Sequence, residues 1–208
     1  MAQKSKKTIT LLIIFIGIAV VFGAKIYFGS SKDHSMSGSF AKIKGSNDAP
    51  VKVTEFIDFQ CPACAFGAKY LKEVMQRHPE LIRLQLKHFP LQMHKHGFLS
   101  AQYAECSAEQ GKFWQMHDLL LARQNNWKRL DDPRPAFDQM ISEAGIDAKA
   151  IKECVGSGRA DRIIERNRTE GGNRKIRSTP TYFVNGKMVV GKKSLELEIN
   201  RYLEEDSD

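Results

Sequence analysis

The sequence predicts an α/β fold in which a β-α-β unit and a later β-β-α unit flank an all-helical insertion. Two alternating apolar runs, at about 51–59 and 81–89, enclose a helical pattern. Helical patterns without strands then occupy about 91–172. Beyond them, Asn185-Gly186 stands between two apolar, β-branched runs, which is a strong hairpin signal. This order indicates one small sheet whose two halves are separated by helices.

In the first unit, the strand pattern of Val51–Phe59 places four apolar side chains on one face, and Glu55 falls among them. A helix is expected over Cys64–Arg77, where apolar residues recur three and four positions apart, and His78-Pro79 ends it. Leu81–Phe89 alternates leucine with polar residues. It therefore predicts the second strand, and the helix connects the two.

The helical block and the second unit follow from the same rules. The expected helices of the block cover 99–110, 112–123, 135–144, a segment capped by Asp147, and 159–169. The hairpin joins Thr181–Val184 to Lys187–Val190. Ser194 is expected to cap a last helix over 195–203.

The N-terminus predicts a membrane segment. Lysines in residues 1–7, the expected cytoplasmic start, precede an apolar stretch at 8–28 that is interrupted only by Lys25. A transmembrane signal anchor and a cleaved secretory signal both begin in this way. We favour the anchor, followed by a flexible, Gly/Ser-rich tether at 29–45. The body is then expected on the periplasmic or extracytoplasmic side of the cytoplasmic (inner) membrane, as a single-pass protein.

The bulk composition is that of a globular protein, with 208 residues, 42% hydrophobic and 27% charged. The net charge of +8 comes from scattered basic residues, and no RNA-binding or zinc-finger signature accompanies it. A solvated basic surface is therefore expected, without a nucleic-acid partner. His94 and His96 stand two apart with no nearby carboxylate to complete a site, so no metal is expected there.

The motif Cys61-Pro62-Ala63-Cys64, directly after the first strand and at the start of a helix, is typical of a thiol–disulfide redox site. The positive end of a helix favours a thiolate at Cys61, and Pro62 suits the first turn because it has no N–H to leave unpaired. Half of a zinc site has the same spacing, but no second Cys or His pair accompanies it.

Cys106 and Cys154 fall on two expected helices of the insertion. A disulfide between them would close a loop of about 50 residues and stabilise the fold by roughly 4 kcal/mol in the chain-entropy model. Two buried free thiols that pack as small apolar groups are the alternative. We favour the disulfide.

The arrangement resembles the DsbA-like branch of the thioredoxin superfamily. Three segments carry the resemblance, which covers about 41–203: the strand with its Cys61–Cys64 motif, Gly111–Leu120 (GKFWQMHDLL), and Ser178–Gly186 (STPTYFVNG). It implies a thioredoxin fold at 46–90 and 173–208 and a helical insertion at 91–172.

The resemblance also implies residue roles. Cys61 matches the nucleophile that forms a mixed disulfide, Cys64 the resolving cysteine, and Glu55 a buried acid that assists proton transfer. In this family, the proline that Pro180 matches is cis and faces the redox cysteines. The expected substrate contacts are Pro62, Ala63, Thr179 and Pro180. Ala63 stands where the best-known oxidases carry histidine, which implies a milder oxidant.

The expected function is therefore an extracytoplasmic thiol:disulfide oxidoreductase that introduces disulfides into exported proteins with reduced cysteines. The resemblance implies a quinone-linked membrane reoxidase of DsbB type, and no cofactor. The tether is too short for an added dimerisation segment, so a monomer is expected. An isomerase or reductase on the same site is the alternative. A metal-handling or chaperone module is the non-enzymatic alternative.

Overall fold

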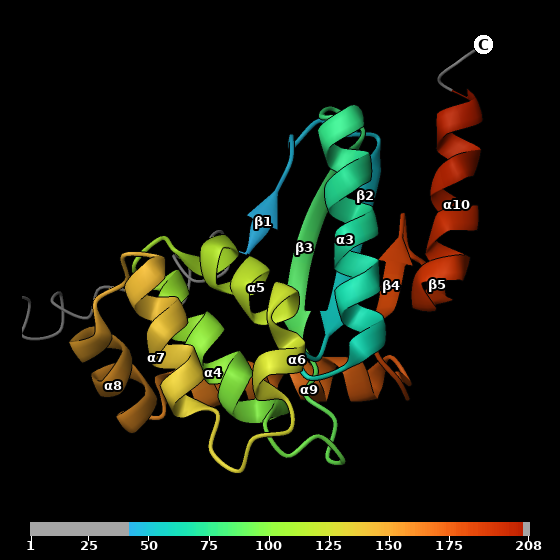
Figure 1. Ribbon diagram of the computed structural model, residues 1–208. Coiled ribbons are helices and arrows are strands. Elements are labelled where there is room, and N and C mark those ends of the chain that lie inside the picture. Colours follow the sequence, from blue (N-terminus) through green and yellow to red (C-terminus); the bar gives the residue numbers. More distant parts are fainter. Residues whose placement is uncertain (1–41, 206–208) are drawn as a thin grey trace, which may run out of the picture. The chain divides into compact units, whose positions relative to one another are not determined.

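A computed structural model describes residues 42–205 and places one five-stranded sheet in them (Figure 1). The strand order is β1-β3-β2-β4-β5, and only β2 and β3 run parallel, while the other neighbours are antiparallel. The strands are β1 Ile43–Lys44, β2 Val51–Ile57, β3 Ile82–His88, β4 Thr181–Val184 and β5 Lys187–Val190.

The helices follow the predicted order of strand, helix, strand, helical block, hairpin and helix. Within the described residues they are α3 Pro62–Arg77, α4 Gly97–Ala108, α5 Phe113–Ala122, α6 Gln124–Trp127, α7 Arg134–Glu143, α8 Ala148–Gly156, α9 Arg159–Asn173 and α10 Gly191–Glu205.

The central strand β2 determines what lies on each face of the sheet. Its odd-numbered Glu55 pairs with Tyr182 of β4, and the Tyr182 hydroxyl lies so close to Gly67 of α3 that a Cβ added there would be 1.9 Å away. Its even-numbered Phe56 faces α9, where a Cβ at Gly171 would touch it and Phe89. Helices α3 and α10 therefore cover one face of the sheet and α9 the other, as Figure 1 shows.

Two apolar clusters form the core. One joins the sheet to α3 and α10 around Leu71, Tyr182 and Ile199. The other joins the carboxyl ends of β2 and β3 to the helical block, with Trp127 and Phe137 fully buried in it. The start of α3, including Cys61, belongs to this second cluster, so the redox motif lies where the sheet meets the helices.

The structure corrects several predicted boundaries. Residues 43–44 of the expected tether form β1, paired with β3. Helix α3 begins at Pro62 rather than Cys64, because Cys61 has the extended backbone of an N-cap. The last helix begins at Gly191, so Ser194 lies inside α10 and does not cap it. The short helix α6 was not predicted.

The predicted membrane helix at 8–28 lies outside the described residues. Within 42–205, none of the helices combines the length and the apolar character needed to span a bilayer.

Candidate active site

The turn before α3 holds Cys61 in place through the backbone. Asp58 accepts a hydrogen bond from the Gln60 N–H at 2.8 Å, and its carbonyl accepts one from the Cys61 N–H at 3.0 Å. The buried amide of Gln124, on α6, donates to the carbonyls of Phe59 and Cys61 at 2.7 and 3.0 Å. The unpredicted helix α6 therefore fixes the backbone on which the first cysteine stands.

The two cysteines of the motif are free thiols with different environments. Cys61 is 8% exposed at the helix N-terminus, and Cys64 is completely buried. The Cys61 thiol lies 3.3 Å from the carbonyl oxygen of Thr179. Only Cys61 can therefore meet a thiol or disulfide from another molecule.

The environments separate the acidities of the pair. The pKa of Cys61 falls from 9.0 to about 5, first because the Cys64 thiol donates to it, and then through Thr179 and the N–H groups of Ala63 and Cys64. Burial opposes this shift. Burial also raises the pKa of Cys64 well above 9.0, and the neighbouring Cys61 adds to the rise. The site therefore holds a thiolate at Cys61 and a thiol at Cys64.

The loop before β4 brings the predicted proline beside this pair. The Thr179–Pro180 peptide bond is cis, and Thr179 is buried. The carbonyl of Pro180 accepts the Gly191 N–H at 2.9 Å, which ties the loop to the start of α10. The expected juxtaposition of Cys61 with this loop is present. Pro62 is the first residue of α3, and Ala63 follows it, exposed on the surface.

Glu55 is fully buried on the α3 face of β2. Neither carboxyl oxygen has a hydrogen-bond partner. Burial raises its pKa to about 8, and the nearby Tyr182 hydroxyl opposes the shift. The charge of an ionised Glu55 would raise the pKa of Cys64 further, so the two groups are close enough to interact.

A buried charge network lies at the carboxyl end of β3 and was not predicted. Glu105 accepts from Lys42 at 2.6 Å and lies 2.8 Å from His88 Nε2. Burial lowers the pKa of His88 and of Lys42, and the hydrogen bond with His88 helps lower the pKa of Glu105 despite burial. These groups come from β3, α4 and the residue before β1, so their role here is to join those elements.

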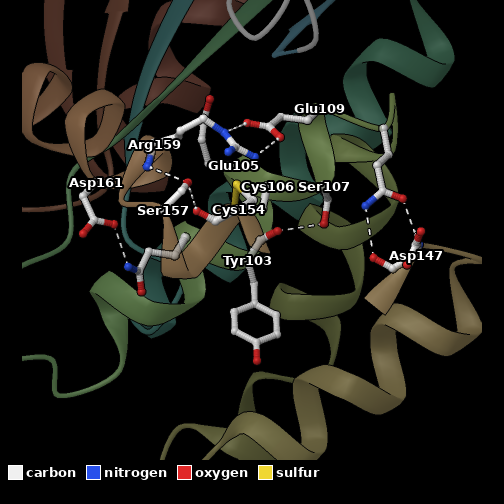
Figure 2. The surroundings of a disulfide bond; sticks show 12 residues. Tyr103, Glu105, Cys106, Ser107, Glu109, Asp147, Cys154, Ser157, Arg159 and Asp161 are labelled. Atoms are coloured by element: carbon white, nitrogen blue, oxygen red, sulfur yellow. Dashed lines mark hydrogen bonds and ion pairs between the residues drawn. A yellow bond between two sulfur atoms is a disulfide. The ribbon is translucent and has the colours of Figure 1, made fainter. Parts of the chain in front are cut away.

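The disulfide predicted in the insertion is present between Cys106 on α4 and Cys154 on α8 (Figure 2). Beside it, Arg159 at the start of α9 forms a two-point ion pair with Glu109, with both distances 3.1 Å. These bonds join three helices of the block at a position separate from Cys61 and Cys64. Among residues 42–205, no cluster of three or more His, Cys, Asp or Glu side chains has an arrangement that could hold a metal ion.

Comparisons with known proteins agree with this geometry. A profile of the thioredoxin family matches residues 41–205. The crystal structure of oxidised BdbD from Bacillus subtilis superposes with a TM-score of 0.68 at 21% identity, covering 81% of this chain and 95% of that one. The crystal structure of alpha-DsbA1 from Wolbachia pipientis superposes with a TM-score of 0.66 at 17% identity, covering 77% of this chain and 89% of that one. The fold is therefore DsbA-like.

Among curated proteins, the chain is similar to the Na(+)/H(+) antiporter NhaA 3 of Salinispora tropica, with 33% identity over 156 residues. It is also similar to NhaA 1 of Salinispora arenicola, with 32% identity over 156 residues. Each alignment covers 74% of this chain but 23% of the relative. The chain thus spans about a quarter of the length of these relatives.

Proposed function

This chain belongs to the thioredoxin family, and we propose that it is a thiol:disulfide oxidoreductase that introduces disulfide bonds into exported proteins. The observation that carries the proposal is the separation of the two cysteine acidities. The pKa of Cys61 at about 5 favours its thiolate at neutral pH, while Cys64 stays a buried thiol. A dithiol of this kind forms and exchanges disulfides through one accessible sulfur.

The oxidised protein would act in two steps. A substrate thiolate attacks Cys61 Sγ, the Cys61–Cys64 bond breaks, and Cys64 leaves as a thiolate that takes up a proton. A second substrate thiolate then attacks the substrate sulfur of the mixed disulfide. The substrate gains a disulfide, and Cys61 leaves as the stabilised thiolate. Two electrons pass from the substrate to the protein.

Glu55 is the proton donor and acceptor for Cys64 in this scheme. Its pKa of about 8 lies close to neutral pH, where a buried carboxyl can exchange protons in either direction. The substrate chain would lie along the loop at Thr179 and Pro180, which is next to Cys61. Pro62 and Ala63 would form the other side of that contact.

The oxidising direction is supported by the same acidity. A thiolate stabilised at pH 7 favours the reduced protein, and a stable reduced form makes the disulfide a stronger oxidant. The lack of a histidine at Ala63 favours a milder oxidant than the strongest members of the family. Isomerisation or reduction on the same two cysteines is the second candidate, because either would use an accessible thiolate at Cys61.

The setting of the reaction is also part of the proposal. The basic start and apolar stretch of residues 1–28 favour a membrane anchor with the catalytic part outside the cytoplasm. A disulfide such as Cys106–Cys154 persists in oxidising compartments. Reoxidation would come from a quinone-linked membrane partner, and the protein would work as a monomer. The antiporter activity in the names of the curated relatives belongs to proteins about three times as long as this chain, and we do not extend it to this chain.

The reduction potential of the Cys61–Cys64 pair tests the direction. Equilibration of the full-length protein with glutathione buffers is expected to give roughly −120 to −160 mV, as for oxidising members of the family. A value at or below about −220 mV would place it with the reducing members. Cys61→Ser is expected to lose all activity, and full oxidase activity in that variant would exclude the mechanism.

A further inference from the structure

A small cavity lies between α3 and α5, directly over Glu55. Its volume is about 20 Å³, and about 10–15 Å³ is the least that can hold one water molecule. Side chains from β1, β2, β3, α3 and α5 surround it, including Lys44, Glu55, Ala68, Lys72, Trp114 and His117. Neither Cys61 nor the loop at Thr179 and Pro180 lines this cavity.

Four buried polar atoms of the residues around this cavity lack partners. Both carboxyl oxygens of Glu55, the Nε2 atom of His117 and the Nε1 atom of Trp114 are buried without a hydrogen bond. Glu55 and His117 are 0% and 5% exposed. Buried polar atoms are almost always hydrogen-bonded, to the protein or to water. A water molecule with several polar neighbours would satisfy these atoms together.

His117 links the cavity to a groove on the surface. Its Nδ1 atom lies 2.8 Å from Asp118 Oδ1, and the second carboxyl oxygen of Asp118 accepts from Lys72 at 2.7 Å. Asp118 is held as a carboxylate by these bonds, which lower its pKa despite burial. Nδ1 of His117 is therefore the donor, and the lone pair of the neutral ring at Nε2 remains free to accept. His117 and Asp118 also line the open groove between α3 and α5, about 350 Å³ in volume.

We propose that a water molecule in this cavity, together with His117 and Asp118, forms a proton route between Glu55 and the groove between α3 and α5. The inference rests on the proposed function, in which Cys64 must lose or gain a proton. While the mixed disulfide exists, the bound substrate covers the surface at Cys61. The route lets Glu55 exchange its proton with solvent from the opposite helix while substrate is bound.

The proton balance of one turnover shows where the route is needed. In the reduced protein, Cys61–S⁻ attacks oxidised glutathione, forms a mixed disulfide and releases one glutathione thiolate. Glu55 gives its proton to solvent through the water and His117, and then accepts the proton of Cys64. The Cys64 thiolate attacks Cys61 Sγ and releases the second glutathione thiolate, so that the protein is oxidised by two electrons.

Several charged groups face Glu55 and belong in any account of its titration. Lys44 of β1, Lys72 of α3 and the His117–Asp118 pair of α5 line or border the cavity. The charge of Glu55 raises the pKa of Cys64 of α3, and Tyr182 of β4 lowers the pKa of Glu55. At pH 6.5 most of Glu55 is protonated, since its pKa is about 8. At pH 9.5 the carboxylate is already present, so the route is no longer needed for a single turnover.

The experiment follows the mixed disulfide in the reduced, full-length protein after mixing with oxidised glutathione, by acid quench and mass spectrometry. Two variants interrupt the route: His117→Phe removes the acceptor nitrogen, and Ala68→Val fills the cavity without touching a polar group. Tyr70→Phe is the matched control, because it removes a buried, unpartnered hydroxyl of α3 that does not line the cavity.

At pH 6.5, formation of the mixed disulfide is expected at the wild-type rate in all variants. Its resolution by Cys64 is expected to slow about tenfold in His117→Phe and Ala68→Val, less than the roughly 100-fold loss typical of a missing general base. Tyr70→Phe is expected to match the wild type. The slowing should disappear at pH 9.5, which a merely structural defect would not show.

Two results would overturn the inference. One is an unchanged resolution rate at pH 6.5 in either folded variant, and the other is a slowing that is the same at both pH values. In both cases the proposed function stands, because the mixed disulfide still forms and resolves. If the wild-type protein forms no mixed disulfide, the proposed function itself is overturned.

Discussion

The ionisation of Cys61 gives a prediction that can be worked out in numbers. Its pKa is about 5 in the folded, reduced protein, against an ordinary value of 9.0. A thiol whose pKa is depressed by folding stabilises the fold above the ordinary pKa and loses that contribution as pH falls through the folded pKa. For Cys61 the full contribution is present above about pH 9 and is lost at about pH 5.

The size follows from 1.36 kcal/mol for each pKa unit. The shift of about four pKa units stabilises the folded protein by about 5 kcal/mol above pH 9. At neutral pH, about two units above the folded pKa, the stabilisation is about 3 kcal/mol. Because the oxidised protein has no thiolate, the same effect should make the disulfide more oxidising at pH 7 by about 60 mV, at about 30 mV for each 1.4 kcal/mol.

The assay is denaturant unfolding of the reduced protein and of Cys61→Ser at several pH values from 5 to 9. Serine does not ionise, whereas Glu55 titrates in both proteins, so the difference between them isolates the thiolate. We expect the difference in unfolding free energy to rise by about 1.4 kcal/mol per pH unit across this range. Thiolate absorbance should titrate with a midpoint near 5. A flat difference, or a midpoint near 8 or 9, would refute the reasoning.

Three further predictions concern single positions. Cys64→Ser should keep the first exchange but trap a mixed disulfide at the accessible cysteine, visible as an added mass on the intact protein. Glu55→Gln should stabilise the fold, because the raised pKa of this acid costs stability that begins above pH 4.5 and becomes fully developed above about pH 8; unfolding should show a small gain at pH 5 and a much larger one at pH 9. Cys106→Ala in the oxidised protein should lower the unfolding free energy by roughly 4 kcal/mol while thiol exchange continues, and unchanged stability would contradict the chain-entropy account.

Features that depend on neighbouring residues could be predicted from the sequence. The strand before Cys61, the helix after it and the Asn185-Gly186 hairpin all rest on local patterns, and each is present. The alternation of β2 placed Glu55 on the apolar face, but could not exclude an exposed side chain. Its burial follows from β2 lying between β3 and β4 with α3 above, which is a property of the whole fold.

Features that join distant segments could not be predicted. Lys42 and Glu105 are 63 residues apart, and nothing in either neighbourhood indicates the other. β1 has two residues, too few for any periodicity to appear. His117 carried a signal, since it lies in the segment that supports the resemblance. Its contact with Asp118 and its position over Glu55 depend on how α5 packs against α3, which the sequence does not reveal.

Cys61, Cys64 and Glu55 together carry about one negative charge at neutral pH, and in the proposed mechanism this determines the order of the reaction. While Cys61 is a thiolate, its charge raises the pKa of Cys64 and prevents a second ionisation nearby. Once Cys61 enters a mixed disulfide, that charge is gone, and the pKa of Cys64 falls at the moment when Cys64 must attack. Glu55, mostly protonated until then because of burial, can release its proton and take the one from Cys64. The proposed mechanism therefore has the accessible cysteine react first, and the buried one react only after a substrate has been captured.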